Sequence, residues 1–391
     1  MTFKDIQAAR ARLDGIAQRT PLSHSSTFSR MSGAEVWLKC ENLQRTGSFK
    51  LRGAYNRLAQ LTPAEGKRGV IAASAGNHAQ GVALAAQLLG IQATVFMPES
   101  TPLAKVAATQ SYGADIRLEG GSYDEACDAA LRFQEHSQAT FVHPYDDRAV
   151  MAGQGTIACE ILEDVADVDA VVVPVGGGGL VCGIAVAAKA VRPGIQVIGV
   201  RAAQAGAGTI ADGINVREPL ASAVQLADDI VAVEEEDISH AVVLLLERCK
   251  LVVEGAGAVG LAALLSRRVS VGAQKVAVVL SGGNIDVNLM ARIIEHGLAT
   301  SGRYLIFETW LQDRPGELLK VLQVLLDERV NILSVEHRRP ASFPEVEVML
   351  TVETRDFAHG ERLLDRLRER GYRVNRLEVG ATSAASDPSH G

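Results

Sequence analysis

The feature that most restricts the possible folds is a repeated alternation, from residue 70 onward, of short apolar runs with longer helical patterns. The runs are rich in Val, Ile and Ala, and such near-continuous apolar strands are typical of parallel sheets covered by helices on both faces. We therefore predict an α/β fold, with a ligand site in the glycine-rich loops at the carboxyl edge of the sheet. The expected strands are 69–74, 93–98, 114–120, 139–145, 169–175, 195–200, 230–233 and 275–281.

The pattern changes after residue 301, which predicts a second domain. The expected order there is strand, helix, strand, strand, helix, strand, which is the ferredoxin-like arrangement. These elements fall at 303–311, 314–329, 330–339, 345–354, 357–371 and 372–379. A chain of 391 residues is long enough for two domains. We predict domains 1–301 and 302–380, and a disordered tail at 381–391, which is small and polar.

Composition excludes several classes of protein. With 47% hydrophobic and 22% charged residues the chain is expected to be globular, and a net charge of −7 argues against a nucleic-acid partner. No apolar run is long enough to span a bilayer, and the N-terminus reads as an amphipathic helix instead of a signal peptide. The cysteines have neither zinc-ligand nor redox-motif spacing, so a reducing cytoplasm is the expected location. They are Cys40, Cys127, Cys159, Cys182 and Cys249.

Four consecutive glycines, Gly176 to Gly179, stand between an expected strand and an expected helix. Backbone N–H groups converge there without side chains, and the helix adds its positive end, so the loop predicts a site for one phosphate. A tight turn is the simpler alternative, but it needs only one or two glycines. A dinucleotide site with Arg201 at a 2′-phosphate is the other alternative. It lacks G-x-G-x-x-G, because the third glycine would fall on Val181 or Cys182.

Two further strand-to-helix junctions offer polar groups at the same edge. In SAGNHAQGVA, several side-chain and backbone donors could bind one small anion such as a carboxylate, with Asn77 at the expected N-cap. The residues concerned are Ser74, Ala75, Gly76, Asn77 and His78. A plain helix cap is an equally simple interpretation of Asn77. The other junction, VVLSGGNID, places Ser281 at the end of a strand, and alone it indicates only a turn.

Lys50, in TGSFKLRGAYNR, has no Asp or Glu within four residues, and Phe49 and Arg52 are close by. It is either a surface lysine near a helix start or an amine kept partly neutral so that it can act as a nucleophile. A phosphate site, a carboxylate site and an isolated lysine together indicate a phosphorylated cofactor that reacts with amines. Pyridoxal 5′-phosphate meets all three requirements, with Lys50 as its attachment point and Phe49 against its ring.

Five motifs in order, GSFKLRGA, SAGNHAQGVA, PVGGGGL, TIADG and LSGGN, resemble those of the threonine dehydratases, also called threonine ammonia-lyases. These belong, with serine racemase, to the tryptophan-synthase-β-like class of pyridoxal-phosphate enzymes. The resemblance implies the two-lobed parallel-sheet architecture known as fold type II. In the second domain, DRPGEL and NILSVEH are similar to the amino-acid-binding regulatory domain called ACT.

The resemblance also implies a role for each site residue. Lys50 forms the Schiff base and takes the α-proton, Asn77 binds the cofactor's 3′-oxygen, and Ser281 faces the pyridine nitrogen. A neutral Ser281 favours prompt β-elimination of water, giving 2-oxobutanoate and ammonia from threonine, with serine as a secondary substrate. The phosphate is held by Gly176, Gly177, Gly178, Gly179 and Leu180. The substrate carboxylate is held by Ser74 to His78.

An effector site is expected in the second domain. The Pro-Gly pair at 315–316 starts a helix directly after a strand, so its free N–H groups could bind an amino-acid carboxylate. Asp313 could accept from the ligand's ammonium group, and Asn331 and Ile332 could complete the pocket from a paired domain, together with Gly316. The resemblance favours isoleucine as ligand and a homodimer or homotetramer. Alternatively, Asp313 only caps the helix and the domain only joins subunits.

The sequence departs from the family pattern in two places, and three alternative functions are also considered. Segment 199–213 is shorter than in members of that family, so we expect a loop or helix near the edge of the site to be missing. Arg201 stands where serine-racemase-like relatives carry an acidic metal ligand, so no metal is expected. The alternatives are serine racemase or 3-hydroxyaspartate dehydratase, a non-catalytic amino-acid sensor, and an NADP-binding oxidoreductase.

Overall fold

The computed structural model describes residues 1–271, 274–339 and 345–377, so the expected tail at 381–391 lies outside the described residues. The chain divides into two compact units, Met1–Leu289 and the part from Met290 onward, which are described separately. Helix α13 (Val287–Thr300) contains the division. Among the described residues, no helix is long and apolar enough to cross a membrane.

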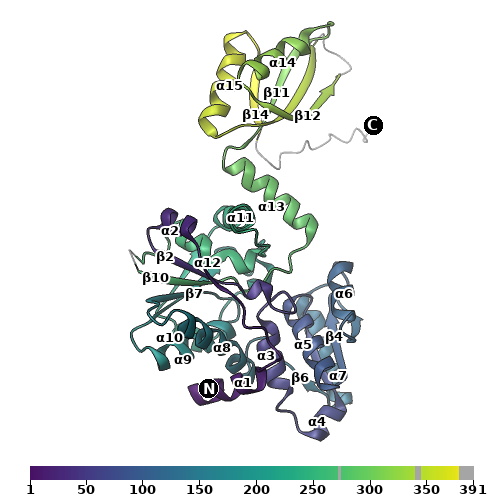
Figure 1. The fold of residues 1–391 in the computed structure, drawn as a ribbon. Helices are drawn as coiled ribbons and strands as arrows, with labels where there is room; N and C mark the ends of the chain where they lie inside the picture. The colour runs from purple at the N-terminus through teal and green to yellow at the C-terminus, as the bar shows by residue number, and fades with distance from the viewer. Residues whose placement is uncertain (272–273, 340–344, 378–391) are drawn as a thin grey trace. The chain divides into compact units, whose positions relative to one another are not determined.

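The first unit contains a six-stranded sheet in the order β1-β2-β10-β7-β8-β9 (Figure 1). Only β1 is antiparallel to its neighbour, and the other pairings are parallel. The strands are β1 (Leu22–His24), β2 (Glu35–Lys39), β7 (Ala170–Pro174), β8 (Gln196–Ala202), β9 (Asp229–Val233) and β10 (Lys275–Val279). Every residue of β7 is buried, as expected for a parallel strand between two layers of helices.

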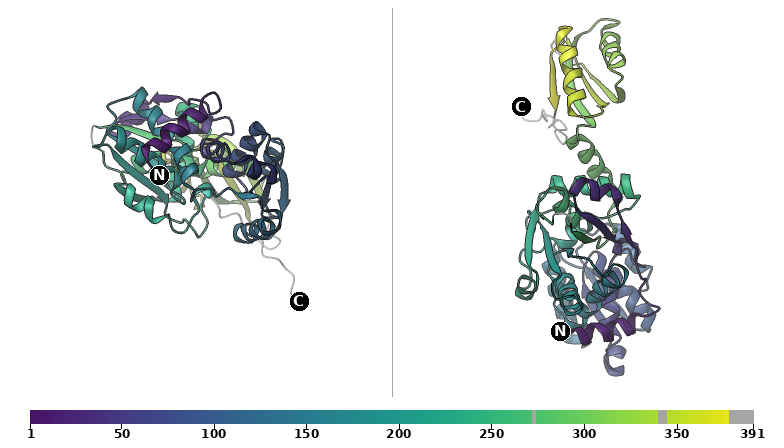
Figure 2. Two further views of the ribbon diagram at one scale, coloured as in Figure 1. Left: turned by 90° about the horizontal axis from the view of Figure 1, so that it is seen from below. Right: turned by 60° about the vertical axis from the view of Figure 1, so that its left-hand side comes forward.

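A second, four-stranded parallel sheet has the order β5-β4-β3-β6. In both views of Figure 2 it lies, with its helices in blue, beside the part drawn in teal and green. Its strands are β3 (Val70–Ala73), β4 (Ala93–Met97), β5 (Asp115–Leu118) and β6 (Thr140–Phe141). The prediction of parallel sheets is confirmed, and β6 is shorter than expected. It ends early because Pro144 has no N–H to donate and the next residues turn around the His143 ring.

Helices pack on both sheets, and glycines allow the closest approach. The pair α8 and α9 is an example, because a Cβ on Gly155 would lie 2.7 Å from the Gly183 carbonyl oxygen. The helices of the first unit are α1 (Phe3–Leu13), α2 (Ser26–Ser32), α3 (Lys50–Leu58), α4 (Pro63–Arg68), α5 (Asn77–Leu89), α6 (Leu103–Gln110), α7 (Tyr123–Ser137), α8 (Arg148–Asp164), α9 (Gly179–Val191), α10 (Ala221–Leu226), α11 (Glu235–Leu244) and α12 (Gly255–Leu265). Shorter turns are η1 (Glu41–Leu43), η2 (Asp212–Ile214) and the π-helical η3 (Leu245–Cys249).

The second unit has a four-stranded antiparallel sheet in the order β12-β13-β11-β14. Alternate residues of β11 are buried against two helices, which gives the sheet one apolar face. The elements are β11 (Tyr304–Gln312), α14 (Glu317–Asp327), β12 (Asn331–Arg338), β13 (Glu345–Glu353), α15 (Phe357–Glu369) and β14 (Val374–Leu377). The expected order, strand-helix-strand-strand-helix-strand, is the order observed.

Candidate active site

Lys50 is the first residue of α3, and the segment before it lies beside the end of β10. The Phe49 N–H donates to the Ser281 carbonyl at 3.1 Å, and Ser48 forms a β-bridge with Gly282. The Lys50 Nζ donates to the Pro144 carbonyl oxygen at 2.9 Å. Three segments that are distant in the sequence therefore meet around residues 48 to 50.

The environment of the Lys50 amine disfavours its charge. Burial lowers its pKa to about 8, although the charge of Glu254 acts in the opposite direction. The Phe49 ring lies 5.2 Å from Nζ. A lysine with a pKa of about 8 is about one-tenth neutral at pH 7, far more than an ordinary lysine, and the neutral amine is the form that can act as a nucleophile or a base.

The glycine loop follows β7 and leads into α9, and its own backbone donors are free. Among the described residues, none accepts a hydrogen bond from the backbone N–H groups of Gly176 to Leu180. Gly178 has a φ of +102°, and a Cβ on Gly177 would collide with the Tyr145 ring. Both positions therefore require glycine. The loop combines free donors with the N-terminal end of a 13-residue helix, so a phosphate fits it.

The loop between β3 and α5 is a second group of free donors. Gly76 is the N-cap of α5 and Asn77 is its first residue, so the prediction of Asn77 at the N-cap is corrected by one position. The Ser74 Oγ accepts from the Gly76 N–H at 3.2 Å. No described residue accepts from the N–H groups of Ala75, Asn77 and His78, which remain available to a carboxylate.

The His78 side chain points away from these donors. Its Nε2 lies 2.8 Å from the Val142 carbonyl oxygen, and the residue is buried. Burial, and then the charge of Lys50, lower its pKa to about 3, so the ring is neutral and Nε2 is the donor. Through Nε2 the side chain supports the chain just after β6, and the His78 backbone N–H remains available to a substrate.

Two residues that were not predicted from the sequence complete the site. The Asn77 Nδ2 donates to the Glu254 Oε1 at 2.6 Å, and the Asn284 Nδ2 donates to the Asn77 Oδ1 at 2.8 Å. Burial, and then the charge of Asp212, raise the pKa of the Glu254 carboxyl to about 7. The sequence signal was a single acid in the glycine-rich apolar segment VVEGAGAVG, where a charge has no structural reason to be.

Ser281 follows β10, which pairs directly with β7. It is buried, and its backbone carbonyl holds Phe49. Tyr145 connects the lysine to the glycine loop, because it follows Pro144 and its ring lies against Gly177. These contacts connect the segments that carry the residues predicted for the site in the first domain. The predicted residues are Phe49, Lys50, Ser74, Ala75, Gly76, Asn77, His78, Gly176, Gly177, Gly178, Gly179, Leu180 and Ser281.

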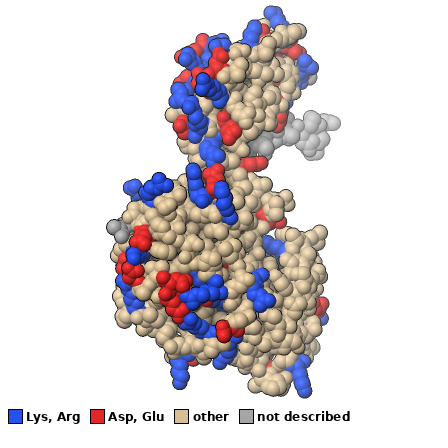
Figure 3. Space-filling model, viewed as in Figure 1, with Lys and Arg blue, Asp and Glu red and all other residues tan. Residues whose placement is uncertain are grey.

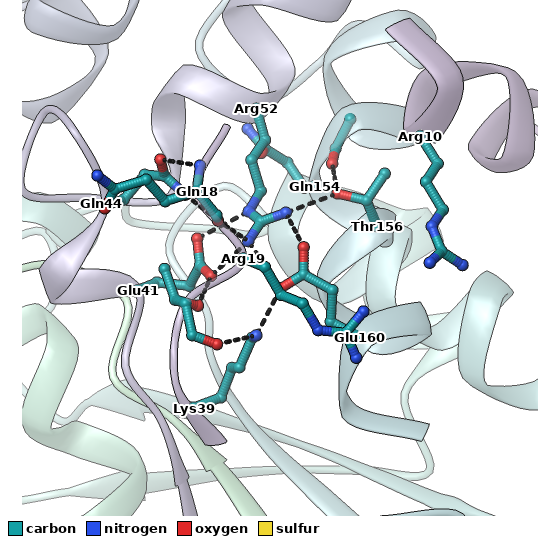
Figure 4. Close-up of polar contacts among 12 residues, drawn as sticks. Arg10, Gln18, Arg19, Lys39, Glu41, Gln44, Arg52, Gln154, Thr156 and Glu160 are labelled. Atoms are coloured by element: carbon teal, nitrogen blue, oxygen red, sulfur yellow. Dashed lines mark hydrogen bonds and ion pairs between the residues drawn. The ribbon is translucent and has the colours of Figure 1, made fainter. Parts of the chain in front are cut away.

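A buried network of four charged side chains lies two residues beyond Lys50 (Figure 4). The Arg52 Nε and Nη2 donate to the two carboxylate oxygens of Glu41, each at 2.8 Å. The Arg52 Nη1 donates to Glu160 at 2.6 Å, and the Lys39 Nζ donates to the same carboxylate at 2.5 Å. Two positive and two negative charges compensate each other, and this network joins α3 to the end of β2 and to α8.

Arg201, which was considered for a 2′-phosphate, instead binds backbone. Its Nη2 donates to the carbonyl oxygens of Val216 and Arg217, both at 2.7 Å. It therefore holds the short connection that follows β8.

In the second unit, the predicted effector residues surround the start of α14 and of β12. Asp313 forms an ion pair with Arg339 at 3.1 Å, and Gly316 is the N-cap of α14 with a φ of +92°. Asn331 donates to Glu353 at 3.3 Å, and Ile332 is 38% exposed.

Comparison with known proteins gives consistent results. The family described as "Pyridoxal-phosphate dependent enzyme" matches residues 13–282. The L-threonine ammonia-lyase of Thermotoga maritima is 49% identical over 399 residues, which cover 96% of this chain and 99% of that protein. The structure of threonine deaminase isoform 2 from Solanum lycopersicum, in its processed form, has a TM-score of 0.71 at 34% identity, and the match covers 75% of this chain and 87% of that chain. The serine racemase of Dictyostelium discoideum has a TM-score of 0.70 at 33% identity, with coverage of 73% and 99%.

Proposed function

This chain belongs to the family of pyridoxal-phosphate-dependent enzymes, and we infer from its 49% identity to an L-threonine ammonia-lyase that it is a threonine ammonia-lyase. It converts L-threonine to 2-oxobutanoate and ammonia by eliminating water. The observation that carries this function is the Lys50 amine, with a lowered pKa, at the meeting point of two loops with free N–H groups. Its parallel sheets are those of pyridoxal-phosphate fold type II.

Each predicted residue has a defined part in holding the cofactor. The free N–H groups of Gly176 to Gly179 and of Leu180 would bind the phosphate. Phe49 would form an apolar wall for the ring, Asn77 would donate to the 3′-oxygen, and Ser281 would face the pyridine nitrogen. When bound, pyridoxal phosphate supplies an acceptor for the electron pair that remains after the substrate loses its α-proton.

The remaining chemistry is performed by the protein's own groups. The N–H groups of Ala75, Asn77 and His78 would bind the substrate carboxylate, and the Ser74 hydroxyl would lie beside them. The Lys50 Nζ, neutral in part near pH 7, would accept the α-proton. The Pro144 carbonyl oxygen would orient this amine whenever it is free. L-Serine, which lacks only the threonine methyl group, is proposed as a secondary substrate.

One assay tests this function and separates it from the alternatives. The purified protein, supplied with pyridoxal phosphate, should form 2-oxobutanoate from L-threonine and pyruvate more slowly from L-serine. Formation of D-serine without 2-oxobutanoate would support a racemase, and activity on 3-hydroxyaspartate alone would support that dehydratase. Binding of amino acids without turnover would support a sensor. Each of these three results would overturn the proposal.

We also propose that the second unit is an ACT-like regulatory domain, occupying 302–380, which binds isoleucine. Its support is the ferredoxin-like element order and the Gly316 N-cap, where the helix of 11 residues begins. The proposed ligand contacts are Asp313, Gly316, Asn331 and Ile332, in a homodimer or homotetramer. Calorimetric titration with isoleucine should show binding to the full-length enzyme, and Gly316→Val should weaken it, because a Cβ at a φ of +92° is strained. Equal binding by both proteins would contradict this site.

We also propose a reducing cytoplasm as the location, because the five cysteines have neither zinc-ligand nor redox-motif spacing.

A further inference from the structure

We propose that Glu254 and Asn284 are positioning residues, which together fix the orientation of the Asn77 amide so that its nitrogen, not its oxygen, is left to bind the cofactor. This inference rests on the proposed function, since it takes Asn77 as a cofactor ligand. It adds two residues to the site, neither of which touches the cofactor in the roles described above.

The orientation of Asn77 follows from a chain of hydrogen bonds whose first member cannot reverse. The Thr46 carbonyl oxygen can only accept, and it accepts from the Asn284 Nδ2 at 2.7 Å. The second N–H of that nitrogen donates to the Asn77 Oδ1 at 2.8 Å. The Asn77 oxygen is therefore the end that faces Asn284.

The other end of the Asn77 amide is fixed by an acceptor. The Asn77 Nδ2 donates to the Glu254 Oε1 at 2.6 Å. One N–H of Asn77 then remains, and no described residue accepts from it. A ligand at this position meets a donor, which suits the 3′-oxygen of the cofactor.

The Glu254 carboxylate is confined to its position. The residue is 4% exposed, and its backbone N–H donates to the Gly282 carbonyl oxygen at 3.1 Å. A Cβ on Gly282 would collide with the Glu254 Oε1 and would lie 3.0 Å from the Asn77 Nδ2. Glycine at 282 thus leaves the room in which the carboxylate and the amide meet.

Substitutions that change the direction of these bonds test the inference. In Asn284→Asp, a carboxylate replaces the donor, so the Asn77 amide is expected to turn and present its oxygen. The cofactor-free protein should then bind pyridoxal phosphate at least about tenfold more weakly, measured by calorimetric titration. Glu254→Gln keeps an acceptor oxygen and should change the dissociation constant by less than about threefold.

A double variant distinguishes control of the Asn77 amide orientation from a purely structural role of Glu254 and Asn284. In Glu254→Gln with Asn284→Asp, Asn77 can again bond to both neighbours, but with donor and acceptor exchanged. The thermal unfolding midpoint should recover relative to Asn284→Asp alone, whereas the affinity for pyridoxal phosphate should not. Recovery of both would overturn the inference, because the two residues would then act only as structural supports.

A matched control comes from a buried asparagine outside the site. Asn56 is 1% exposed, donates to the Ala149 carbonyl at 2.7 Å and accepts from Arg12 at 3.0 Å. Asn56→Asp should lower the unfolding midpoint and leave the dissociation constant within about twofold.

Two further outcomes have a defined meaning. If Asn284→Asp does not fold, Glu254→Leu, which removes the acceptor, should bind at least about tenfold more weakly than Glu254→Gln, and equal affinity would overturn the inference. Wild-type protein that does not bind pyridoxal phosphate would contradict the proposed function itself, whereas a folded Asn284→Asp or Glu254→Leu variant that binds as well as wild type contradicts only the orientation of Asn77.

Discussion

Lys50 and Arg52 are two cations in the first turn of one helix, Lys50 half-buried and Arg52 buried, and their polar partners differ. Arg52 is 1% exposed and donates to two carboxylates, from Glu41 and Glu160 (Figure 4). Lys50 donates to a backbone carbonyl, and no carboxylate of the described residues forms an ion pair with it. The nearby charge of Glu254 acts on it only at a distance.

The difference shows how one turn of helix can hold a structural charge and a reactive amine. Burial lowers the pKa of Arg52, but the charges and hydrogen bonds of Glu41 and then Glu160 more than offset it, so the net shift is upward. For Lys50 burial prevails. Full compensation keeps a group charged and immobile, while incomplete compensation leaves a proton that can be exchanged near neutral pH.

The largest expected effect is on turnover, at Lys50. Lys50→Ala should lower the rate of 2-oxobutanoate formation by about a thousandfold or more, because it removes the amine that is proposed to take the α-proton. The stability of the cofactor-free protein should change by less than about 1 kcal/mol, because the lost stem is offset by removing an amine whose charged form is disfavoured. Near-normal turnover would show that Lys50 is not the catalytic amine.

Arg52 should give the reverse result. Arg52→Met leaves the buried Glu41 carboxylate without its cationic partner and leaves Glu160 with Lys39 alone, which should cost about 3–5 kcal/mol of stability. The chain has two tryptophans, Trp37 in the first unit and Trp310 in the second. Urea unfolding followed by fluorescence in a Trp310→Phe background therefore reports the first unit alone. A loss below about 1 kcal/mol would mean that the network is not what stabilises this region.

The sequence around residue 50 could not separate these two cations. Neither has an acid within four residues, and the partners of Arg52 come from 11 and 108 positions away. Lys50 was identified by its combination with the two loops of free N–H groups and by family resemblance. Glu254 was missed for the same reason that the network was, since its bond to Asn77 spans 177 positions.

The features that could be predicted from the sequence are those determined by residues close together in the chain. Apolar runs identified the parallel strands, and runs of glycine identified the loop after β7. Sequence defines a helix start only to within a residue or two, and Asn77 follows the N-cap instead of forming it. Strand ends depend on neighbours as well, so β6 is shorter than its apolar pattern indicates.

Two buried glutamates extend the comparison to pH. Burial, and then the charge of Asp212, raise the pKa of Glu254 to about 7 from an ordinary 4.5, so between these values the folded protein holds a proton that the unfolded chain releases. Stability of the cofactor-free protein should fall across pH 4.5 to 7, by on the order of 3 kcal/mol. Burial opposes ionisation of Glu41, but Arg52 prevails and lowers its pKa, so its contribution is lost as pH falls instead.

Glu254→Gln provides the measurement for this pH dependence. The difference in unfolding free energy between wild type and Glu254→Gln should move in favour of the variant as pH is raised from about 5 to about 8, because all other titrating groups are common to both. A difference that stays constant over this range would show that the folded and unfolded proteins bind the Glu254 proton equally.

The smallest expected effect is at the surface, where Lys and Arg side chains lie among Asp and Glu on the face seen in Figure 3. Arg19 forms ion pairs with Glu163 at 2.8 Å and with Asp164 at 2.5 Å, so its geometry is as good as that of Arg52. Its side chain is 45% exposed, however, and water replaces the lost partner when it is removed. Arg19→Met should therefore cost no more than about 1 kcal/mol, and less at high salt. If Arg19→Met cost as much stability as Arg52→Met in the same urea assay, burial would not be what distinguishes the two arginines. The explanation of the lowered Lys50 pKa, that no carboxylate offsets the effect of burial on its charge, would then lose its basis.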